Sequence, residues 1–286
     1  MTTTGTFDWT AVASGWDAHR GHVEGMKEEL SRRLLAQLDL QPGDRVLELG
    51  AGTGELARQL ATAVGPEGHV VASDVAPGMV ELQRKTLAGL DNAEVAQLDA
   101  FDTGLEAGTF DAVVFRMGLM LVDDPPRVLR ECHRLLAQGG RLAVAVWAGP
   151  EHNPWMTCVG MAAMMHGLVS GGPPTGPGGM FSLADPAVLE RVVADAGFTD
   201  VVVRDVSTPS RFASADEHFD TVTALAGPLS AAIAAASEDT RAAVRKTTAG
   251  LSAAHRTANG LELAGRALVC TAKRAEPARR LVAPLA

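Results

Sequence analysis

The chain has 286 residues, 47% of them hydrophobic and 21% charged, so it can form one large or two small domains with a sizeable core. There are 25 Lys and Arg residues against 34 Asp and Glu residues, which gives a formal net charge of −9. An acidic chain without a basic run is a poor partner for a phosphate backbone, which argues against nucleic acid. The three widely spaced cysteines favour a reducing, cytoplasmic environment. No apolar stretch is long enough for a membrane span.

The N-terminal part is predicted to be helical and to lead into a strand, a glycine turn and a helix. Trp9, Val12, Trp16 and His19 are spaced for one face of a first helix, and Leu30 to Leu38 mark a second. An apolar strand then precedes glycines at alternate positions, Gly50, Gly52 and Gly54. Glycine is needed where the backbone takes positive φ or approaches a ligand. Such a turn, opening onto a helix, is where open α/β sheets bind nucleotides.

The rest of the chain alternates strands with helices, which predicts a mostly parallel sheet with right-handed crossovers. Further strands are expected at residues 69–73, 93–97, 110–115, 141–147, 201–206 and 261–272, with helices starting near Pro77, after Asp124 and at Pro186. A short helix is expected at 154–168, and alanine-rich helices at 215–254 are expected to add a layer to the sheet. No independent second domain is expected. The expected segments are 1–40 (N-terminal lid helices), 41–148 (core), 149–183 (insert), 184–275 (rest of the sheet with added helices) and 276–286 (a frayed tail).

The residues around the glycine turn discriminate between nucleotides. A dinucleotide dehydrogenase requires Gly-x-Gly-x-x-Gly, but position 55 is Glu. Three acids stand instead within or at the ends of the first three strands, namely Glu48, Asp74 and Asp99. A carboxylate can accept hydrogen bonds from both hydroxyls of a ribose. Several acids and no basic residue favour a cationic nucleoside without phosphates.

The combined motifs resemble those of class I S-adenosylmethionine (SAM)-dependent methyltransferases, and within them the ubiquinone/menaquinone-biosynthesis type that acts on small molecules. The motifs are Leu47–Gly54, Asp74 with Pro77–Met79, Leu98–Ala100, Phe110–Met120 and Leu135–Val144. The resemblance covers about residues 40–147. It implies a Rossmann-like, doubly wound sheet of seven strands with an antiparallel last strand. It also implies SAM as cofactor and S-adenosylhomocysteine as product.

The same resemblance assigns cofactor contacts by position. The methionine end of SAM would meet Glu48, Gly50, Ala51, Gly52, Gly54 and the Arg116 carbonyl. The ribose and adenine would meet Asp74, Met79, Asp99, Ala100 and Phe101. Arg116 departs from the small polar residue that is common there, so its side chain must point away from the sulfonium or towards an acid. Trp16 is the first candidate for an aromatic lid over the cofactor and Trp9 the second, the alternative being that both simply pack the helix on the core.

Methyl transfer is an in-line displacement, and a general base helps when the acceptor is a phenol, an enol or a protonated amine. The candidate bases are His152, His22 and His19, although a histidine at any of these places more often has a structural role, and His152 is preferred because it follows the fifth strand. An apolar acceptor site is expected from Trp9, Met117, Trp147, Trp155, Met156 and Phe181. The methionines of the insert suggest a pliable wall or an ordinary helix core. No metal site is expected.

Several alternatives stay open at this stage. The acceptor atom could be carbon, oxygen or nitrogen. The chain could bind SAM without transferring methyl, as a cyclase or a sensor, and a nicotinamide reductase is disfavoured by Glu55. The oligomeric state is also open, a homodimer being one option.

Overall fold

Seven strands form the main sheet of the computed structural model, which describes residues 7–275. They are β1 (Arg45–Glu48), β2 (His69–Asp74), β3 (Ala93–Gln97), β4 (Phe110–Arg116), β5 (Leu136–Trp147), β6 (Phe198–Ser207) and β10 (Arg266–Arg274). Their order is β3-β2-β1-β4-β5-β10-β6, and β10 alone runs antiparallel to its neighbours in this sheet. The predicted seven-stranded, doubly wound α/β sheet with an antiparallel last strand is therefore confirmed.

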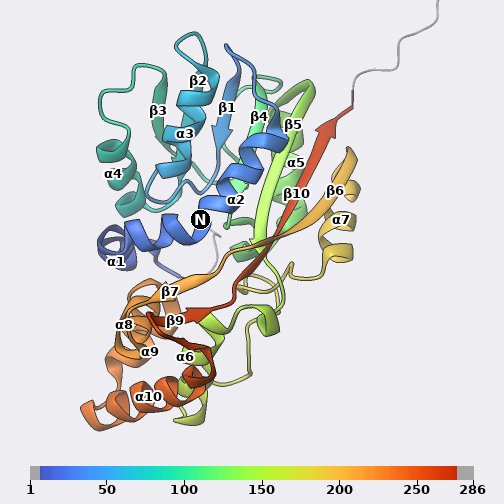
Figure 1. Cartoon of the computed structure of the whole chain (residues 1–286). Coiled ribbons are helices and arrows are strands. Elements are labelled where there is room, and N and C mark those ends of the chain that lie inside the picture. Colours follow the sequence, from blue (N-terminus) through green and yellow to red (C-terminus); the bar gives the residue numbers. More distant parts are fainter. Residues whose placement is uncertain (1–6, 276–286) are drawn as a thin grey trace, which may run out of the picture.

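Helices flank this sheet, and their first turns show why they begin where they do (Figure 1). They are α2 (Arg20–Leu38), α3 (Glu55–Val64), α4 (Pro77–Thr86), α5 (Pro125–Leu135) and α7 (Pro186–Asp195). Asp124 and Asp185 cap α5 and α7, accepting hydrogen bonds from Arg127 N and Ala187 N, and a proline follows each cap. None of the helices within residues 7–275 combines the length and the hydropathy that crossing a bilayer requires.

The N-terminal segment is divided differently from the prediction. A 3₁₀ turn, η1 (Trp9–Val12), leads into the short helix α1 (Ala13–Ala18), and α2 follows after a break at His19. The long helix α2 buries Leu30, Leu34 and Leu38 and packs on β5 and β10. The first ten residues of α2 thus continue past the sheet towards the carboxyl ends of the parallel strands.

The late helices do not add a layer to the sheet, so that expectation was wrong. They pack together beyond the carboxyl ends of the parallel strands, in a group that we call the cap (Figure 1), and their buried side chains continue the hydrophobic core of the sheet. The cap contains α6 (Pro154–Met165), α8 (Ala215–Leu225), α9 (Gly227–Ala235), α10 (Glu238–Leu251), η4 (Ala253–His255), and a small sheet of β7 (Ser210–Phe212), β9 (Gly260–Leu263) and β8 (Arg256–Thr257). Helix α6 packs on α8, α9 and α10 because most of its side chains are apolar, so it needs neighbours on several sides.

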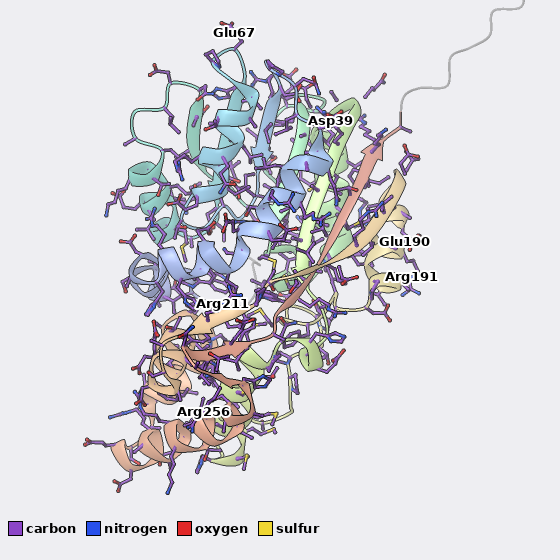
Figure 2. All side chains as sticks on the ribbon, viewed as in Figure 1. Asp39, Glu67, Glu190, Arg191, Arg211 and Arg256 are labelled. Carbon is purple, nitrogen blue, oxygen red and sulfur yellow. The ribbon has the colours of Figure 1, made fainter. Side chains whose placement is uncertain are left out.

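The single final strand that the sequence predicts over 261–272 is two strands, β9 in the cap and β10 in the main sheet. Between them Gly265 lies beside Thr208 of the β6–β7 connection, and Thr208 N donates to the Gly265 carbonyl at 2.8 Å, so the antiparallel pairing of β6 with β10 continues into that of β7 with β9. A Cβ at Gly265 would lie 2.1 Å from the Thr208 carbonyl oxygen, so only glycine fits this close contact. In Figure 2, Asp39 and Glu67 mark the end of the molecule away from the cap, and Arg211 and Arg256 mark the cap. The predicted tail, 276–286, lies outside the described residues.

Candidate functional site

The glycine turn between β1 and α3 needs its glycines for two different reasons. Gly50, Gly52 and Gly54 have φ values of 58°, 57° and 86°, in the left-handed region. A Cβ on Gly50 would lie 2.6 Å from the Phe115 ring, so the turn is packed tightly on its β4 side. No atom lies within 4 Å of the place where a Cβ on Gly52 would stand. The turn is therefore closed at Gly50 and open at Gly52, where a ligand can approach the backbone.

Asp74, at the end of β2, connects that strand to the turn. Its Oδ2 accepts a hydrogen bond from Gly52 N at 3.1 Å, and its Oδ1 accepts one from Ala76 N at 3.0 Å. Burial raises the pKa of this carboxyl, and the backbone donors oppose that rise. A carboxylate offers about four acceptor positions, so capacity for further donors remains after these two bonds.

Glu48 is the most unusual group at the turn. Its side chain is 1% exposed, and its Oε2 has no hydrogen-bond partner among the described residues. Burial raises the pKa of Glu48 to about 8, while the nearby Arg116 and Lys27 charges pull it down. A buried polar atom without a partner is costly, and a cationic amine would supply the missing donors. Glu48 and the open side of Gly52 thus fit the amino-acid end of SAM.

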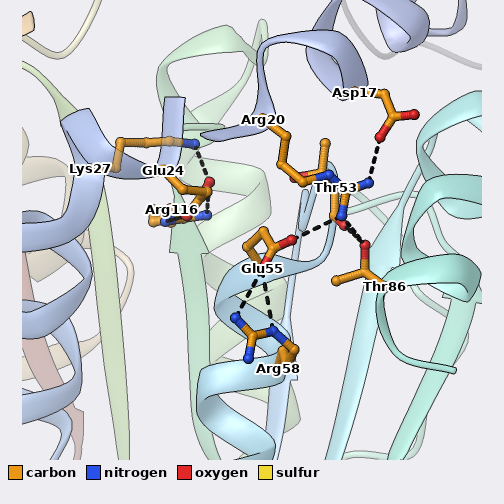
Figure 3. A network of polar contacts seen from close by, with 9 residues as sticks. All are labelled: Asp17, Arg20, Glu24, Lys27, Thr53, Glu55, Arg58, Thr86 and Arg116. Atoms are coloured by element: carbon orange, nitrogen blue, oxygen red, sulfur yellow. Dashed lines mark hydrogen bonds and ion pairs between the residues drawn. The ribbon is translucent and has the colours of Figure 1, made fainter. Parts of the chain in front are cut away.

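Two buried cations, Arg116 and Lys27, act electrostatically on Glu48. Arg116 donates through Nη1 to Glu24 Oε2 at 2.9 Å and through Nη2 to Glu24 Oε1 at 3.0 Å (Figure 3). Arg116 Nη1 also donates to Ser31 Oγ at 2.7 Å. Lys27 Nζ lies 3.2 Å from Glu24 Oε1. The Arg116 side chain does point towards an acid, as the sequence required, but Glu24 and Lys27 were missed. We call Glu24, Lys27, Glu48 and Arg116 the buried charge cluster.

A second polar network joins the N-terminal helices to the turn (Figure 3). Arg20, at the start of α2, forms ion pairs with Glu55 at 2.9 Å and with Asp17 at 2.7 Å. Arg20 also donates to Thr86 Oγ1, which donates in turn to the Thr53 carbonyl at 2.6 Å. Glu55 occupies the position where a dinucleotide motif has glycine, and here it holds α2 against the start of α3.

The residues expected around adenine divide into two groups. Met79 is buried with Ala13, Ala76 and Leu82, and Trp9 and Trp16 pack on this group. Asp99 Oδ1 accepts from Phe101 N at 2.9 Å, which orders the loop that contains Ala100. The contacts of the two tryptophans are those of the packing alternative, and their position over SAM stays a prediction.

Trp16 also connects the cap to the buried charge cluster. Its Nε1 donates to the Leu225 carbonyl, at the end of α8, at 3.2 Å. Its ring lies under Lys27 Nζ, with 5.4 Å between Nζ and the ring centroid. The short helix α1 therefore contacts α4 on one side and α8 on the other.

The three candidate bases have different polar partners in the described structure. His22 Nε2 lies 2.9 Å from Ser210 Oγ, and its ring stacks on Phe212 with centroids 4.6 Å apart. His19 Nδ1 lies 3.4 Å from Thr221 Oγ1 on α8. His152, in η3 (Pro150–His152), lies 3.3 Å from Glu151 Oε1 and is 43% exposed. Burial lowers the pKa of His22, which keeps its ring neutral.

The expected acceptor site is apolar and packed. Trp147 and Trp155 are buried in an edge-to-face pair with ring centroids 5.4 Å apart, and Phe181 is buried nearby in the same core, with Met156 packed against it. Met117 has a φ of 65°, an uncommon value for a residue other than glycine, at the carboxyl end of β4. Three methionines of the insert do not line this site but are exposed on α6, namely Met161, Met164 and Met165.

Two hollows in the surface lie away from the glycine turn. One, of about 620 Å³, is at the amino ends of the parallel strands beside Asp39 and Arg141. The other, of about 460 Å³, lies between α8 and α10. Among residues 7–275, no three His, Cys, Asp or Glu side chains group closely enough to hold a metal ion. The site at the turn is thus defined by its polar groups and not by either of these hollows.

The buried charge cluster makes the pH dependence of stability a test of its geometry. Burial raises the pKa of Glu48 from 4.5 to about 8, so the folded chain keeps a proton that the unfolded chain releases between these pH values. The contribution of Glu48 to the free energy of unfolding is fully present below pH 4.5 and is lost as the pH rises through 8. For Lys27, whose pKa is lowered from 10.5 to about 8, the folded chain releases its proton first, so stability rises between pH 8 and 10.5.

We therefore expect Glu48→Gln to abolish the decrease in the free energy of unfolding between pH 4.5 and 8. The increase above pH 8, which comes from Lys27, should remain. Because each unit of pKa shift corresponds to about 1.4 kcal/mol, the two stability curves should diverge by a few kcal/mol over the lower window. Urea denaturation at half-unit steps of pH measures both curves. Parallel curves for the two proteins would show that Glu48 titrates as an exposed carboxyl.

Comparisons with known proteins agree with this geometry. Residues 46–140 match a family model described as a methyltransferase domain. The ubiquinone/menaquinone biosynthesis C-methyltransferase UbiE of Teredinibacter turnerae is 33% identical over 147 residues, which cover 50% of this chain and 59% of the relative. A demethylmenaquinone methyltransferase of Clavibacter sepedonicus is 40% identical over 108 residues, which cover 38% of this chain and 43% of the relative.

Solved structures extend the similarity of fold beyond the matched domain. The crystal structure of the YcgJ protein from Bacillus subtilis superimposes with a TM-score of 0.59 and 17% identity, covering 86% of this chain and 98% of that one. This chain spans less than two thirds of the length of either methyltransferase relative. The matched segment contains the glycine turn, Glu48, Asp74, Asp99 and Arg116. Residues 46–140 are therefore similar to a methyltransferase domain.

Proposed function

We propose that this protein transfers the methyl group of SAM to a small apolar or aromatic acceptor. The observation that carries the proposal is Glu48, a buried carboxyl group whose Oε2 has no hydrogen-bond partner among the described residues. It ends the strand that leads into the turn with the open Gly52. A cationic amino group supplies what that oxygen lacks, and the remaining acceptor positions of Asp74 suit two ribose hydroxyls. A dinucleotide would instead place a negatively charged pyrophosphate at the turn that follows the buried carboxyl group of Glu48.

The chain has the parts to hold such a cofactor in one orientation. We assign the amino-acid end to the turn and the Arg116 carbonyl, and the adenine end to Met79, Asp99 and the loop that follows it. When bound, SAM supplies a methyl group on a positively charged sulfur. The protein's contribution is alignment and exclusion of water, because in-line displacement needs donor and acceptor held in contact. The acceptor would approach from the cap side, where Trp147 and Trp155 lie.

Binding and turnover are tested separately. In calorimetric titrations we expect SAM and S-adenosylhomocysteine to bind and NAD not to bind. In assays with methyl-labelled SAM and a panel of small aromatic acceptors, we expect labelled product. Binding of S-adenosylhomocysteine without any labelled product would favour a cyclase or sensor, and tighter binding of NAD would favour a reductase.

Alanine variants test which of the three candidate histidines acts as the general base. His152 remains the proposed general base because it directly follows β5, with His22 and His19 as alternatives on the N-terminal helices. We expect His152→Ala to lower kcat by about a hundredfold or more if it accepts the acceptor's proton. Turnover within twofold of the wild type would remove His152 from consideration, and the same assay on His22→Ala and His19→Ala ranks the other two.

The cysteines support the proposed reducing, cytoplasmic setting. Cys132, Cys158 and Cys270 are buried free thiols. Burial raises the pKa of Cys132 and of Cys270 to about 12, so these thiols stay protonated and unreactive.

A further inference from the structure

One edge of the main sheet is formed by β6, and no strand within residues 7–275 pairs with its outer side (Figure 1). Three consecutive valines lie on this strand. Val201 and Val203 are half-buried, and Val202 is 40% exposed. An exposed apolar edge strand is a template for pairing with another strand, and folded proteins usually cover or protect it. The edge of β6 therefore raises the question of what pairs with it.

The hydrogen bonds to the neighbouring strand β10 show which backbone groups of β6 face outward. Thr208 N donates to the carbonyl of Gly265, the residue directly opposite it in the register of the two strands. Along an antiparallel pair, opposite residues that bond to each other alternate with residues that do not. The register is unbroken over 202–207, so the even-numbered residues bond to β10. The N–H and C=O groups of Val203 and Asp205 consequently point away from the sheet.

The register with β10 shifts near the start of the strand. Neither Asp200 nor Val201 has a partner on β10, and Asp200 has a φ of 52°. A bulge of this kind leaves the extra residue unpaired and twists the strand, which is one way of protecting an edge. It also leaves the backbone of these two residues available to a second strand.

The charges along β6 are arranged symmetrically about Val202. Asp200 lies two residues before it and Arg204 two residues after it. If two copies of the strand pair antiparallel about a two-fold axis at Val202, Asp200 of each copy lies opposite Arg204 of the other. Arg204 forms no ion pair with another residue in the range 7–275. Asp200 lies 3.6 Å from Lys273 Nζ, with both side chains mostly in water.

Other registers of the same pairing are less favourable. A two-fold axis at Arg204 or at Asp205 sets like charges opposite each other, which is destabilising. An axis at Val201 or at Val203 leaves Asp200 and Arg204 without opposite charges. An axis between two residues sets outward-facing backbone groups against inward-facing ones, so the hydrogen bonds of a ladder cannot form. The axis at Val202 alone pairs opposite charges, and it also packs the most exposed valine on its own copy.

We propose that the free edge of β6 is an interface with a second copy of this chain, which continues the main sheet across a two-fold axis at Val202. Val201 and Val203 of the two copies exchange backbone hydrogen bonds, and an ion pair between Asp200 and Arg204 closes each end. The paired segment is five residues long, so the dimer belongs to the small, reversible class of complexes. The interface is independent of the proposed function.

Helix α7 would take part in the same interface. It packs on β6, and a two-fold axis normal to the sheet places α7 of both copies on the same face of the joined sheet. Glu190 and Arg191 of α7 are exposed beside β6 and have charges of opposite sign (Figure 2). Two copies of this helix therefore meet without a surplus of either charge at these positions.

Sedimentation velocity of the full chain over a range of micromolar concentrations measures the dimer. We expect a monomer–dimer equilibrium that shifts to the dimer as the concentration rises. Arg204→Asp sets like charges opposite each other at both ends of the ladder, so it should weaken the dimer by at least about tenfold. Adding Asp200→Arg to that variant restores opposite charges in reversed order and should recover most of the lost affinity.

A matched control separates the proposed edge from a general effect of charge. Arg211 is an exposed arginine on another strand, β7 of the cap, where its Nε lies 2.9 Å from Glu262 Oε2. Arg211→Asp changes the net charge as Arg204→Asp does and should leave the dimer unchanged. Thermal unfolding of each variant verifies that it is folded.

Amide hydrogen exchange, followed residue by residue by NMR, tests the backbone geometry. The amides of Val202 and Arg204 bond to β10 and should be protected at every concentration, whereas the amide of Val203 should gain protection only as the dimer forms. A chain that stays monomeric at the highest concentration has an edge protected by its bulge and charges, which would overturn the proposal. So would a dimer that is unaffected by Arg204→Asp, or one that leaves the Val203 amide unprotected.

Discussion

Replacing Asp74 with alanine is expected to weaken the binding of S-adenosylhomocysteine by at least about a hundredfold. Hydrogen bonds to a charged group contribute about 1.5–3 kcal/mol each, and two ribose hydroxyls would lose their common acceptor. The same substitution also releases Gly52 N and Ala76 N, so the turn loses its connection to β2. Calorimetry with S-adenosylhomocysteine measures the affinity, and thermal unfolding shows how much of the loss is structural.

A matched control for Asp74 exists at the other end of the same sheet. Asp111 Oδ2 accepts a single hydrogen bond from Arg45 N at 2.8 Å, near the start of β4 and far from the turn. Asp111→Ala should lower stability by about 1 kcal/mol and leave the affinity unchanged. If Asp74→Ala binds S-adenosylhomocysteine within a few fold of the wild-type affinity, Asp74 does not bind the ribose hydroxyls, whatever the control shows.

Breaking the buried ion pair should produce the largest loss of stability. Arg116→Met leaves Glu24 without its bidentate partner in a buried setting, which costs about 3–5 kcal/mol of the free energy of unfolding. The double variant Arg116→Met/Glu24→Met removes both charges and should recover a large part of that loss. Lys27 remains unpaired in the double variant, which limits the recovery. Urea denaturation at pH 7 measures all three variants.

The control for this pair is exposed. Arg211 Nε lies 2.9 Å from Glu262 Oε2 on the cap, and both side chains are largely in water. Exposed pairs contribute about 0–1 kcal/mol, so Arg211→Met should change stability by no more than that. Losses of equal size in Arg116→Met and Arg211→Met would mean that Arg116 is hydrated and not part of a buried cluster.

Local patterns predicted the main sheet because the information they use lies within a few residues. The apolar run of β4 and the caps at Asp124 and Asp185 each specify one element without reference to the rest of the chain. The glycine turn was recognised for the same reason. The failures came where a boundary depends on a distant partner, as at Gly265, whose role exists only because Thr208 lies against it.

The residues of the candidate site were likewise predictable only where the local sequence indicated them. Glu48, Asp74 and Asp99 stand at strand ends, where the topology of a parallel sheet already brings them together. Glu24 and Arg116 are 92 positions apart, and nothing in either local segment indicates the other. In the cap, His218 and Trp155, which share a hydrogen bond, are separated by 63 positions, on two helices whose packing no sequence pattern specified. The spacing of apolar residues on α6 and α8 predicts that these helices have buried faces, but not against which neighbour.

The close contact of Thr208 with Gly265 has a mechanical consequence for the chain. The two segments that join the main sheet to the small sheet of the cap run side by side there and are hydrogen-bonded to each other, so they form one two-stranded ribbon and not two independent connections. A Cβ at position 265 would press on the Thr208 carbonyl and force the two segments of this ribbon apart.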